Sequence, residues 1–407
     1  MKILQINFYD LFSTGNIMLN IARVARERGH DVRTASKYMR MSVIRKSNNP
    51  HHFYIGNRVT NTIHRYFSWI TDLQDCASIF PTLRLIYKIG RIKPDIIHLH
   101  DIVGWYLNIG VLFHYLKKKN ISIVWTFHDC WAITGRCVYF DAANCSLWKT
   151  GCGNCPQKEY MPGTWFFDMS AWNYRRKKRL FTGIRNMTIV TPSIWLKELV
   201  SESFLQMYPT IVINNGIDLR LFKPTEGETY CRIKALNKHI VLGVAGTWST
   251  RKGLNDFLYM SGKFPADYTI VLVGLAQEEL PVDTRVVAIS RTHNQVELAE
   301  IYTAATVFAN PTIEDNFPTV NIEALACGTP IVTYRTGGSP ESVDETTGVV
   351  VEQNDIEGMI QAIMQIANRG KNSYRTACLQ KSANYDMSAR FNDYVDLYEQ
   401  IVDNRKA

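Results

Sequence analysis

Long hydrophobic runs are missing from this chain, and so are low-complexity tracts. No apolar stretch reaches the roughly 20 residues that a bilayer-spanning helix needs, so we expect no membrane span. The N-terminus, MKILQINFYDLF, has no small-residue cleavage site behind it, which predicts a first buried strand and not an export signal. With 46% hydrophobic and 20% charged residues, the 407-residue chain is not a disordered one, and it fits an α/β enzyme of two domains.

Acidic residues are too few to balance the basic ones, since 37 Asp and Glu stand against 46 Lys and Arg, a net charge of +9. Such a chain attracts acidic partners: nucleic acid, anionic lipid or phosphorylated substrates. No nucleic-acid-binding module is recognisable, so no nucleic-acid partner is expected. The basic run YRRKKR at 174–179 follows an aromatic group, Trp165, Phe166, Phe167 and Trp172. Two interpretations stay open: a solvated helix face beside buried aromatics, or a surface that rests on an anionic membrane.

The first half of the chain alternates short buried strands with amphipathic helices, the pattern of a parallel sheet covered on both faces. The predicted strands are 2–7, 31–35, 95–98, 122–127 and 187–191. A helix is predicted over 17–28, with Ile17 and Ile21 on one face and Gly29 as its stop. Residues 39–91 show no strand–helix rhythm, and we interpret them as an insertion that shapes an acceptor pocket.

The second half repeats the pattern. Its predicted strands are 211–214, 240–245, 269–273, 286–289, 307–310 and 331–333, and its predicted helices are 253–264, 295–304, 318–326 and 356–367. The repeat predicts two doubly wound α/β domains, 1–210 and 211–386, with the ligand in the cleft between them. A final amphipathic helix is expected within 387–407.

The most informative stretch is 310–330, NPTIEDNFPTVNIEALACGTP, an acidic loop directly before a helix that ends at Gly328. Backbone N–H groups at a helix start bind anions, and carboxylates on the following turns accept hydrogen bonds from sugar hydroxyls. Asp315 and Glu323 lie on either side of this helix start. The stretch therefore predicts a nucleotide-sugar pocket.

Three segments resemble the donor-site signature of the retaining glycosyltransferases of family 4: DNFP at 315–318, EALACGTPIV at 323–332 and TGGSPE at 336–341. The resemblance extends through most of the chain. It implies the GT-B fold, with two Rossmann-like domains facing a central cleft and a C-terminal helix that crosses back. It also implies a retaining hexosyltransferase that uses a UDP- or GDP-sugar donor. No catalytic cofactor is expected, because no DxD-type metal pair lies near the pocket.

The turn GTWSTRKG, after the strand 240–245, carries the cations of the predicted donor site. Gly246 permits a tight turn. Arg251 and Lys252 lie at the carboxyl end of a parallel strand, where fixed positive charge stabilises a departing diphosphate. The family usually has an arginine directly after this glycine, whereas this chain has Thr247. The resemblance therefore places the phosphate role on Arg251 and Lys252.

The resemblance assigns further roles in the E-x7-E motif of the family. Asp315 stands where the family has its first glutamate, beside the donor sugar, and Glu323 matches the second, which holds the ribose hydroxyls. Asn316, Phe317 and Pro318 match the segment whose backbone faces sugar and phosphate. Asp315 is assigned to catalysis together with the two cations.

On the acceptor side, the resemblance adds residues of the first domain. Gly15 lies in a loop between the first strand and the first helix that closes over the diphosphate in the family. His128 ends a strand and matches a catalytic position near the donor sugar and the acceptor. Asp129 beside it, and His100 and Asp101 at the end of the neighbouring strand, line the acceptor pocket or serve structural hydrogen bonds.

Five of the nine cysteines fall within a glycine-containing loop at 130–155. Cys137, Cys145, Cys152 and Cys155 supply four thiolates, the last two in a C-x2-C knuckle, as a tetrahedral zinc site requires. Free buried thiols and an iron–sulfur cluster are the alternatives. A missing export signal indicates a reducing compartment and argues against disulfides.

These observations favour a transferase that builds a surface polysaccharide, such as a capsule, exopolysaccharide or lipopolysaccharide, on a saccharide or lipid-linked acceptor. We expect it in the cytoplasm, peripheral to the inner face of the cell membrane. No carboxylate nucleophile can be assigned from the sequence, and the family route is front-face attack with the departing phosphate taking the acceptor proton. A GT-B-type nucleotide-sugar epimerase and a catalytically degenerate sugar-nucleotide binder are the alternatives.

Overall fold

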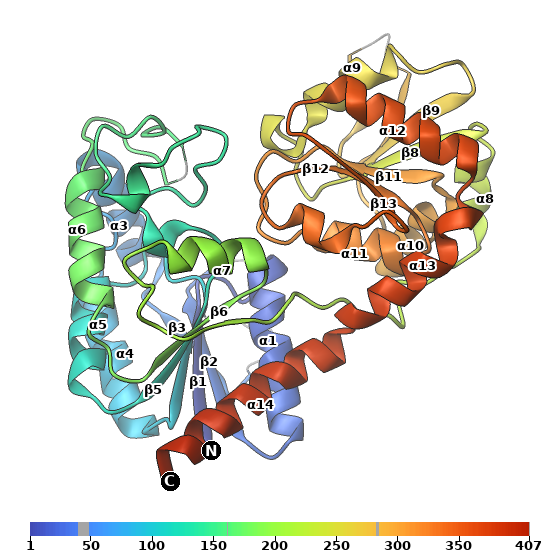
Figure 1. Cartoon of the computed structure of the whole chain (residues 1–407). Coiled ribbons are helices and arrows are strands. Elements are labelled where there is room, and N and C mark those ends of the chain that lie inside the picture. Colours follow the sequence, from blue (N-terminus) through green and yellow to red (C-terminus); the bar gives the residue numbers. More distant parts are fainter. Residues whose placement is uncertain (40–48, 161, 282–284, 407) are drawn as a thin grey trace. The chain divides into compact units, whose positions relative to one another are not determined.

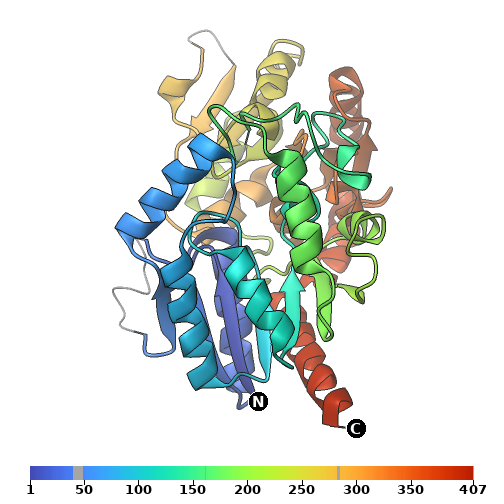
Figure 2. The ribbon, with the colours of Figure 1, turned by 90° about the vertical axis from the view of Figure 1, so that its left-hand side faces the viewer.

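The computed structural model describes residues 1–39, 49–160, 162–281 and 285–406. The chain divides into unit 1, Met1–Ile213 together with Phe391–Ala407, and unit 2, Asn214–Arg390. Each unit is an α/β body around its own parallel sheet, and each has its own hydrophobic core (Figures 1 and 2).

Unit 1 contains a seven-stranded parallel sheet in the order β3-β2-β1-β4-β5-β6-β7. Its strands are β1 (Lys2–Asn7), β2 (Asp31–Lys37), β3 (His52–Ile55), β4 (Ile96–Leu99), β5 (Ser122–Thr126), β6 (Met187–Thr191) and β7 (Thr210–Val212). Every residue of β4 and β5 is buried, because helices cover both faces of the sheet there.

The helices of unit 1 connect these strands in the usual strand–helix alternation. They are α1 (Phe12–Glu27), α3 (Arg58–Thr71), α4 (Ile79–Ile92), α5 (Ile109–Lys118), η1 (Trp131–Ile133), η2 (Leu147–Lys149), α6 (Ser170–Phe181), α7 (Ile194–Ser201) and α14 (Met387–Lys406). Figure 1 shows α1 and α14 on one face of the sheet, with α4, α5 and α6 on the other. Side-chain bonds fasten α14 to unit 1, since Tyr398 OH lies 2.5 Å from His98 Nδ1, and Arg28 pairs with Glu399 at 2.5 Å.

Unit 2 contains a six-stranded parallel sheet in the order β10-β9-β8-β11-β12-β13. Its strands are β8 (His239–Val244), β9 (Tyr268–Val273), β10 (Val286–Ile289), β11 (Val307–Asn310), β12 (Ile331–Tyr334) and β13 (Gly348–Val351). Its helices are α8 (Glu228–Lys234), η3 (Thr250–Lys252), α9 (Leu254–Ser261), η4 (Gln277–Glu279), α10 (Gln295–Ala304), α11 (Thr319–Ala326), η5 (Ser339–Ser342), α12 (Ile356–Arg369), α13 (Asn372–Ser382) and η6 (Ala383–Tyr385). In Figure 1, α9 and α12 cover one face of this sheet, and α10, α11 and α13 cover the other.

Both sheets have a point where the strand order reverses. In unit 1, β1 lies between β2 and β4, and in unit 2, β8 lies between β9 and β11. Loops that leave the carboxyl ends of such neighbouring strands run to opposite faces and leave a crevice, which is where open α/β sheets bind ligands. The fold therefore directs attention to the loops after β1 and β4 and after β8 and β11.

The α/β prediction is confirmed, and β1, β6, β10, β11 and α10 have the predicted ends. The strand expected at 211–214 was assigned to the wrong sheet. It is β7, Thr210–Val212, and it pairs in parallel with β6 in unit 1. A short apolar run shows that a strand is present, but its partner is chosen by backbone hydrogen bonds that the run does not encode.

The interpretation of 39–91 as a segment without strand–helix rhythm was wrong for its described part, since 40–48 lie outside the described residues. β3 pairs in parallel with β2, and α3 and α4 follow it. β3 has only four residues, too few for a clear alternating pattern. The acceptor-pocket role of this region stays a prediction.

Candidate active site

The loops that follow β8 and β11 meet at the switch point of the unit 2 sheet. The first loop ends at Gly253, whose φ of 75° lies in the left-handed region. A Cβ on Gly253 would come within 2.5 Å of the carbonyl oxygen of Pro311 in the second loop. Any larger residue would push the loops apart, so this glycine permits the close approach of the two loops.

The two predicted cations both reach the second loop. Lys252 Nζ lies 2.6 Å from Asp315 Oδ2, and both side chains are largely shielded, at 24% and 18% exposed. Arg251 Nη1 donates to the carbonyl oxygen of Glu314 at 2.8 Å, and the Arg251 carbonyl accepts from the Ile313 N–H at 3.0 Å. The structure thus brings Arg251, Lys252 and Asp315 together. The Asp315 carboxylate and the Glu314 carbonyl therefore hold the two cations in defined positions at the end of the sheet.

The TGGSPE motif holds the segment around Asp315. Gly337 has φ 53°, and a Cβ on it would lie 1.8 Å from the Asp315 carbonyl oxygen. The N–H of Gly338 donates to the same oxygen at 3.3 Å. In the sequence this motif was visible only through the family resemblance, whereas the contact gives its physical reason: only glycine fits.

The predicted donor residues Asn316, Phe317 and Pro318 are buried at the start of α11. The Phe317 ring packs 5.7 Å from that of Tyr385, and the Phe317 carbonyl accepts from Asn215 Nδ2 at 3.4 Å. Pro318 is the N-cap of α11. Because these side chains pack inward, a ligand at this turn would meet main-chain groups, including the N–H groups at the helix start.

Two more residues predicted to bind the donor, Glu323 and Gly246, differ in their surroundings: Glu323 is partly buried, and the space beside Gly246 is open. Glu323 is half-buried on α11, and its Oε2 accepts from the Tyr302 hydroxyl at 3.0 Å. Burial raises the pKa of Glu323 to about 7, and the bond from Tyr302 opposes this shift. No sequence signal pointed to Tyr302 as a neighbour of the site.

Nothing lies within 4 Å of a Cβ placed on Gly246, so its neighbours do not require glycine there.

At the switch point of unit 1, two histidines stack beyond the ends of β4 and β5. His100 Nδ1 lies 3.3 Å from His128 Nε2, with the rings stacked 5.6 Å apart, and His100 Nε2 contacts Gln5 at 2.8 Å. Burial lowers the pKa of His128 to about 4 and that of His100 well below its usual value. Both rings are therefore neutral near pH 7 and act as hydrogen-bonding groups.

Buried carboxyl groups surround the same strand ends. Burial raises the pKa of Asp101 well above its usual value, and the charges of Asp129 and Asp75 raise it further. Burial also raises the pKa of Asp129 to about 6, although Asp129 Oδ1 accepts the Trp131 N–H at 2.8 Å. His100, His128, Asp101 and Asp129 thus lie at one edge of the unit 1 sheet. Their acceptor role stays a prediction.

The basic run 174–179 is partly interior, which corrects the expectation of a wholly solvated or membrane-facing run. Lys177 is 1% exposed, and its Nζ donates to the carbonyl of Trp131 at 2.8 Å. Burial lowers the pKa of Lys177 to about 7, while Asp75 and other nearby groups oppose the shift. Arg176 donates to the Gln74 carbonyl at 3.1 Å. Two of the five basic residues of this run, Arg176 and Lys177, therefore serve the fold, because α6 turns them toward the core.

Gly15 is not in a loop, which corrects the predicted start of the first helix. α1 begins at Phe12, so Gly15 lies in its first turn. A Cβ on Gly15 would approach the carbonyl carbon of Asp10 to 2.8 Å. Glycine therefore lets the first turn of α1 pack closely on the backbone of the turn that precedes it.

The four cysteines of the predicted zinc site are near neighbours. Burial raises the pKa of Cys137 to about 12 and that of Cys152 to about 11, and thiols of the same set add to both shifts. The Gly135 N–H donates to Cys152 Sγ at 3.1 Å, and no disulfide bond joins any of the nine cysteines, all of which lie in the described ranges. In the described ranges, however, no three His, Cys, Asp or Glu side chains are arranged to hold a metal.

Among the helices that the structure describes, none has the length and apolar character to span a bilayer.

Two family models match the chain and between them cover most of it. The model described as "Glycosyltransferase Family 4" matches residues 14–221, and that described as "Glycosyl transferases group 1" matches residues 239–369. WcaC of Escherichia coli, described as a candidate colanic acid biosynthesis glycosyl transferase, is 24% identical over 337 residues, which cover 76% of this chain and 77% of WcaC.

Solved structures of similar fold cover both units. Sucrose-phosphate synthase from Thermosynechococcus elongatus has a TM-score of 0.69 at 16% identity, covering 98% of each chain. HepE from Anabaena, solved in complex with UDP, has a TM-score of 0.67 at 15% identity, covering 98% of this chain and 100% of HepE. HepE in complex with UDP-glucose gives a TM-score of 0.64 at 16% identity with the same coverage.

Proposed function

This chain belongs to glycosyltransferase family 4, and we propose that it transfers a sugar, with retention of configuration, from a nucleoside-diphosphate sugar to a saccharide acceptor. The observation that carries the proposal is the contact of Lys252 with Asp315 at the switch point of unit 2, with Arg251 bound to the same loop. A UDP-sugar is the donor we favour, because HepE shares the fold and was solved with UDP and UDP-glucose.

The chemistry that these residues support is charge stabilisation. When the bond between the sugar anomeric carbon and the β-phosphate oxygen breaks, negative charge grows on the departing diphosphate. Arg251 and Lys252 stabilise this charge more in the transition state than in the ground state, because their positions are fixed beforehand. In the route we favour, the acceptor hydroxyl attacks the same carbon from the leaving-group face and gives its proton to the departing phosphate.

We propose a lipid-linked saccharide as the acceptor and surface-polysaccharide synthesis at the inner face of the cell membrane as the setting. The support is the likeness to WcaC over three quarters of the chain. The acceptor would meet the edge of the unit 1 sheet where His100 and His128 stack. His128 would then serve as a neutral hydrogen-bonding group toward the acceptor.

The test of this function begins with thermal unfolding in the presence of separate UDP- and GDP-sugars. A donor that binds only the folded chain raises the melting temperature by several degrees. The stabilising donor, labelled in its sugar, is then incubated with lipid-linked saccharide acceptors. The expected product carries the label in a new glycosidic bond with the anomeric configuration of the donor. Epimerised free donor as the sole product, or binding without transfer to any acceptor, would contradict the proposal.

We also propose that Cys137, Cys145, Cys152 and Cys155 bind a structural zinc ion. The support is the C-x2-C spacing, the electrostatic interactions among the four thiols and the N–H bond that Gly135 gives to Cys152. Metal binding would have to rearrange these side chains, because in the described ranges no three of them are arranged to hold an ion.

Elemental analysis of purified protein should find about one equivalent of zinc per chain. Cys152→Ser should lose the metal and lower the melting temperature, because structural zinc contributes directly to folding. Cys231→Ser, which changes an exposed thiol in unit 2, is the matched control and should keep it. Less than about half an equivalent of zinc in the parent protein would contradict the proposed zinc site.

A further inference from the structure

Helix α3 presents its apolar side to solvent. Val59, Ile63, Tyr66 and Ile70 recur at steps of four, three and four residues, which places them in one stripe, and they are between 42% and 64% exposed. The stripe forms one face of a strongly amphipathic helix. A surface helix ordinarily turns such a stripe toward the core.

The buried side of α3 is polar. It consists of Asn61, His64 and Ser68. His64 Nδ1 lies 2.8 Å from the Ser78 hydroxyl, and burial lowers the pKa of His64 to about 3. Within the described part of the chain, neither polar atom of the Asn61 amide nor the Ser68 hydroxyl has a hydrogen-bond partner. Burying these groups is unfavourable. This orientation favours an apolar environment around the exposed stripe.

An exposed aromatic loop continues the stripe. Trp165, Phe166 and Phe167 are 54% to 67% exposed, so the interpretation of these three as buried aromatics was wrong. The loop is fixed to the end of α3, because the Trp165 N–H donates to the Trp69 carbonyl at 2.8 Å. The Trp165 ring lies 6.1 Å from that of Tyr66 and 5.3 Å from that of Trp69. We call α3 residues 59, 63, 66 and 70 together with residues 165–167 the aromatic face.

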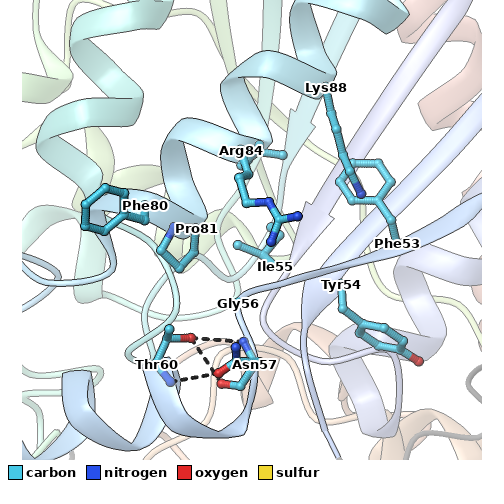
Figure 3. A pocket seen from close by; sticks show the side chains of 11 residues that line it. Phe53, Tyr54, Ile55, Gly56, Asn57, Thr60, Phe80, Pro81, Arg84 and Lys88 are labelled. Carbon is cyan, nitrogen blue, oxygen red and sulfur yellow. Dashed lines mark hydrogen bonds between the residues drawn. The ribbon is translucent and has the colours of Figure 1, made fainter.

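A cavity of about 330 Å³ lies beside this face, between β3, the first turn of α3, and α4. Its lining is mixed: it includes the aromatic rings of Phe53 and Phe80, the polar side chains of Asn57 and Thr60, and two cations, Arg84 and Lys88. Figure 3 shows both cations extending from α4 toward β3, with Lys88 against the Phe53 ring. Lys88 Nζ is 3.9 Å from the centroid of that ring. The cavity therefore combines two positive charges with aromatic and polar side chains.

The charge on these helices is of one sign. α3 and α4 contain no Asp or Glu, and they contain five basic residues, Arg58, Arg65, Arg84, Lys88 and Arg91. The acids that directly follow α3, Asp72 and Asp75, are buried, whereas Glu159 and Asp168 near the aromatic loop are exposed, so the one-sign charge belongs to α3 and α4. A partner for this region must therefore offer both apolar groups and negative charge. A bilayer that contains anionic phospholipid has both, with its phosphates at the level where aromatic rings settle.

We propose that the aromatic face docks unit 1 onto an anionic phospholipid bilayer, with its rings and aliphatic side chains in the interface and with Arg84 and Lys88 against lipid phosphates. The proposal deepens the function given above and rests on it in one respect, that a lipid-linked acceptor would reach the enzyme from this face. The docking itself requires no transfer reaction and can be measured without one.

The test is sedimentation of the full chain with phosphatidylcholine vesicles, with and without phosphatidylglycerol. The protein should bind the anionic vesicles far better, and rising salt should weaken the binding. Ile63→Asp and, separately, Phe166→Asp should each lower the partition coefficient about tenfold or more. Arg84→Ala and Lys88→Ala should each lower it about fivefold.

Met207→Asp is the matched control, because Met207 is 60% exposed on the same unit and Ile63 is 62% exposed. It should bind vesicles like the parent. Donor-induced thermal stabilisation of each variant shows that it is folded. A folded Ile63→Asp variant that loses vesicle binding but glycosylates a water-soluble acceptor supports the docking face.

Three results would overturn the docking. One is equal binding by parent and variants, and another is no preference for anionic vesicles. The third is a dimer in solution that Ile63→Asp dissociates, because the face would then join two copies of the chain. Vesicle binding without any transfer activity would contradict the proposed function alone.

Discussion

Replacing Lys252 with alanine is expected to lower kcat by about 100- to 1000-fold, the usual loss when one preorganised charge-stabilising group is removed. The ammonium sits 2.6 Å from Asp315, largely shielded from solvent, so it is already oriented when a diphosphate arrives. The fold should be little affected, by about 1 kcal/mol or less, because the pair is still partly solvated. Initial rates with a labelled donor, together with thermal unfolding, measure both effects.

Lys381→Ala is the matched control for this variant. Lys381 also pairs at 2.6 Å with a carboxylate of unit 2, Asp344, and its side chain is 20% exposed. Lys381 lies outside the candidate site. Its replacement should therefore leave kcat unchanged and lower the free energy of unfolding by a similar small amount. Lys252→Arg should recover part of the rate, since the charge returns in a different geometry. An unchanged rate in Lys252→Ala, with the protein folded, would remove Lys252 from the mechanism.

Gly337→Ala is expected to have the second large effect, through the backbone. The new methyl group would lie 1.8 Å from the Asp315 carbonyl oxygen, so the two must separate by more than about 1 Å. A displacement of that size near a reacting centre costs about 100-fold in rate. Overpacking and the positive φ should together lower the free energy of unfolding by about 2–4 kcal/mol. Chemical denaturation and kcat at saturating donor measure the two losses.

Gly370→Ala separates the clash from the backbone strain. Gly370 also has a positive φ, 86°, but nothing lies within 4 Å of the point where its Cβ would be. Gly370→Ala should lower the free energy of unfolding by about 1 kcal/mol and leave kcat unchanged. If the two alanine variants behaved alike, the contact of Gly337 with Asp315 would have no part in positioning the site.

The fold was largely predictable because its signals are local. Buried parallel strands appear as short runs of apolar residues, and β1, β6, β10 and β11 were found with their ends. The GT-B expectation from the DNFP and TGGSPE segments is confirmed by the family models and by solved structures that cover 98% of the chain. The sequence predicted that Lys252 and Asp315 share one pocket, and the pairing of β8 with β11 gives the reason, since both residues follow the carboxyl ends of these neighbouring strands.

What failed depended on contacts between distant residues. The basic run 174–179 contained no sign that Lys177 points inward toward the carbonyl of Trp131. The apolar stripe of α3 has helical spacing in the sequence, but the spacing does not show whether the stripe faces the core or the solvent. Only packing shows that Asn61 and Ser68 are buried while Ile63 is exposed.

The sequence by itself determined the two-part α/β architecture, the family and the residues grouped around the acidic loop, because periodicity and short motifs are properties of neighbouring residues. The tertiary structure alone decided that Gly337 supports Asp315, that the stacked histidines are neutral and that α3 turns its apolar side outward. Those outcomes depend on burial and on distances between residues far apart in the chain, and neither exists until the sheets and helices have packed.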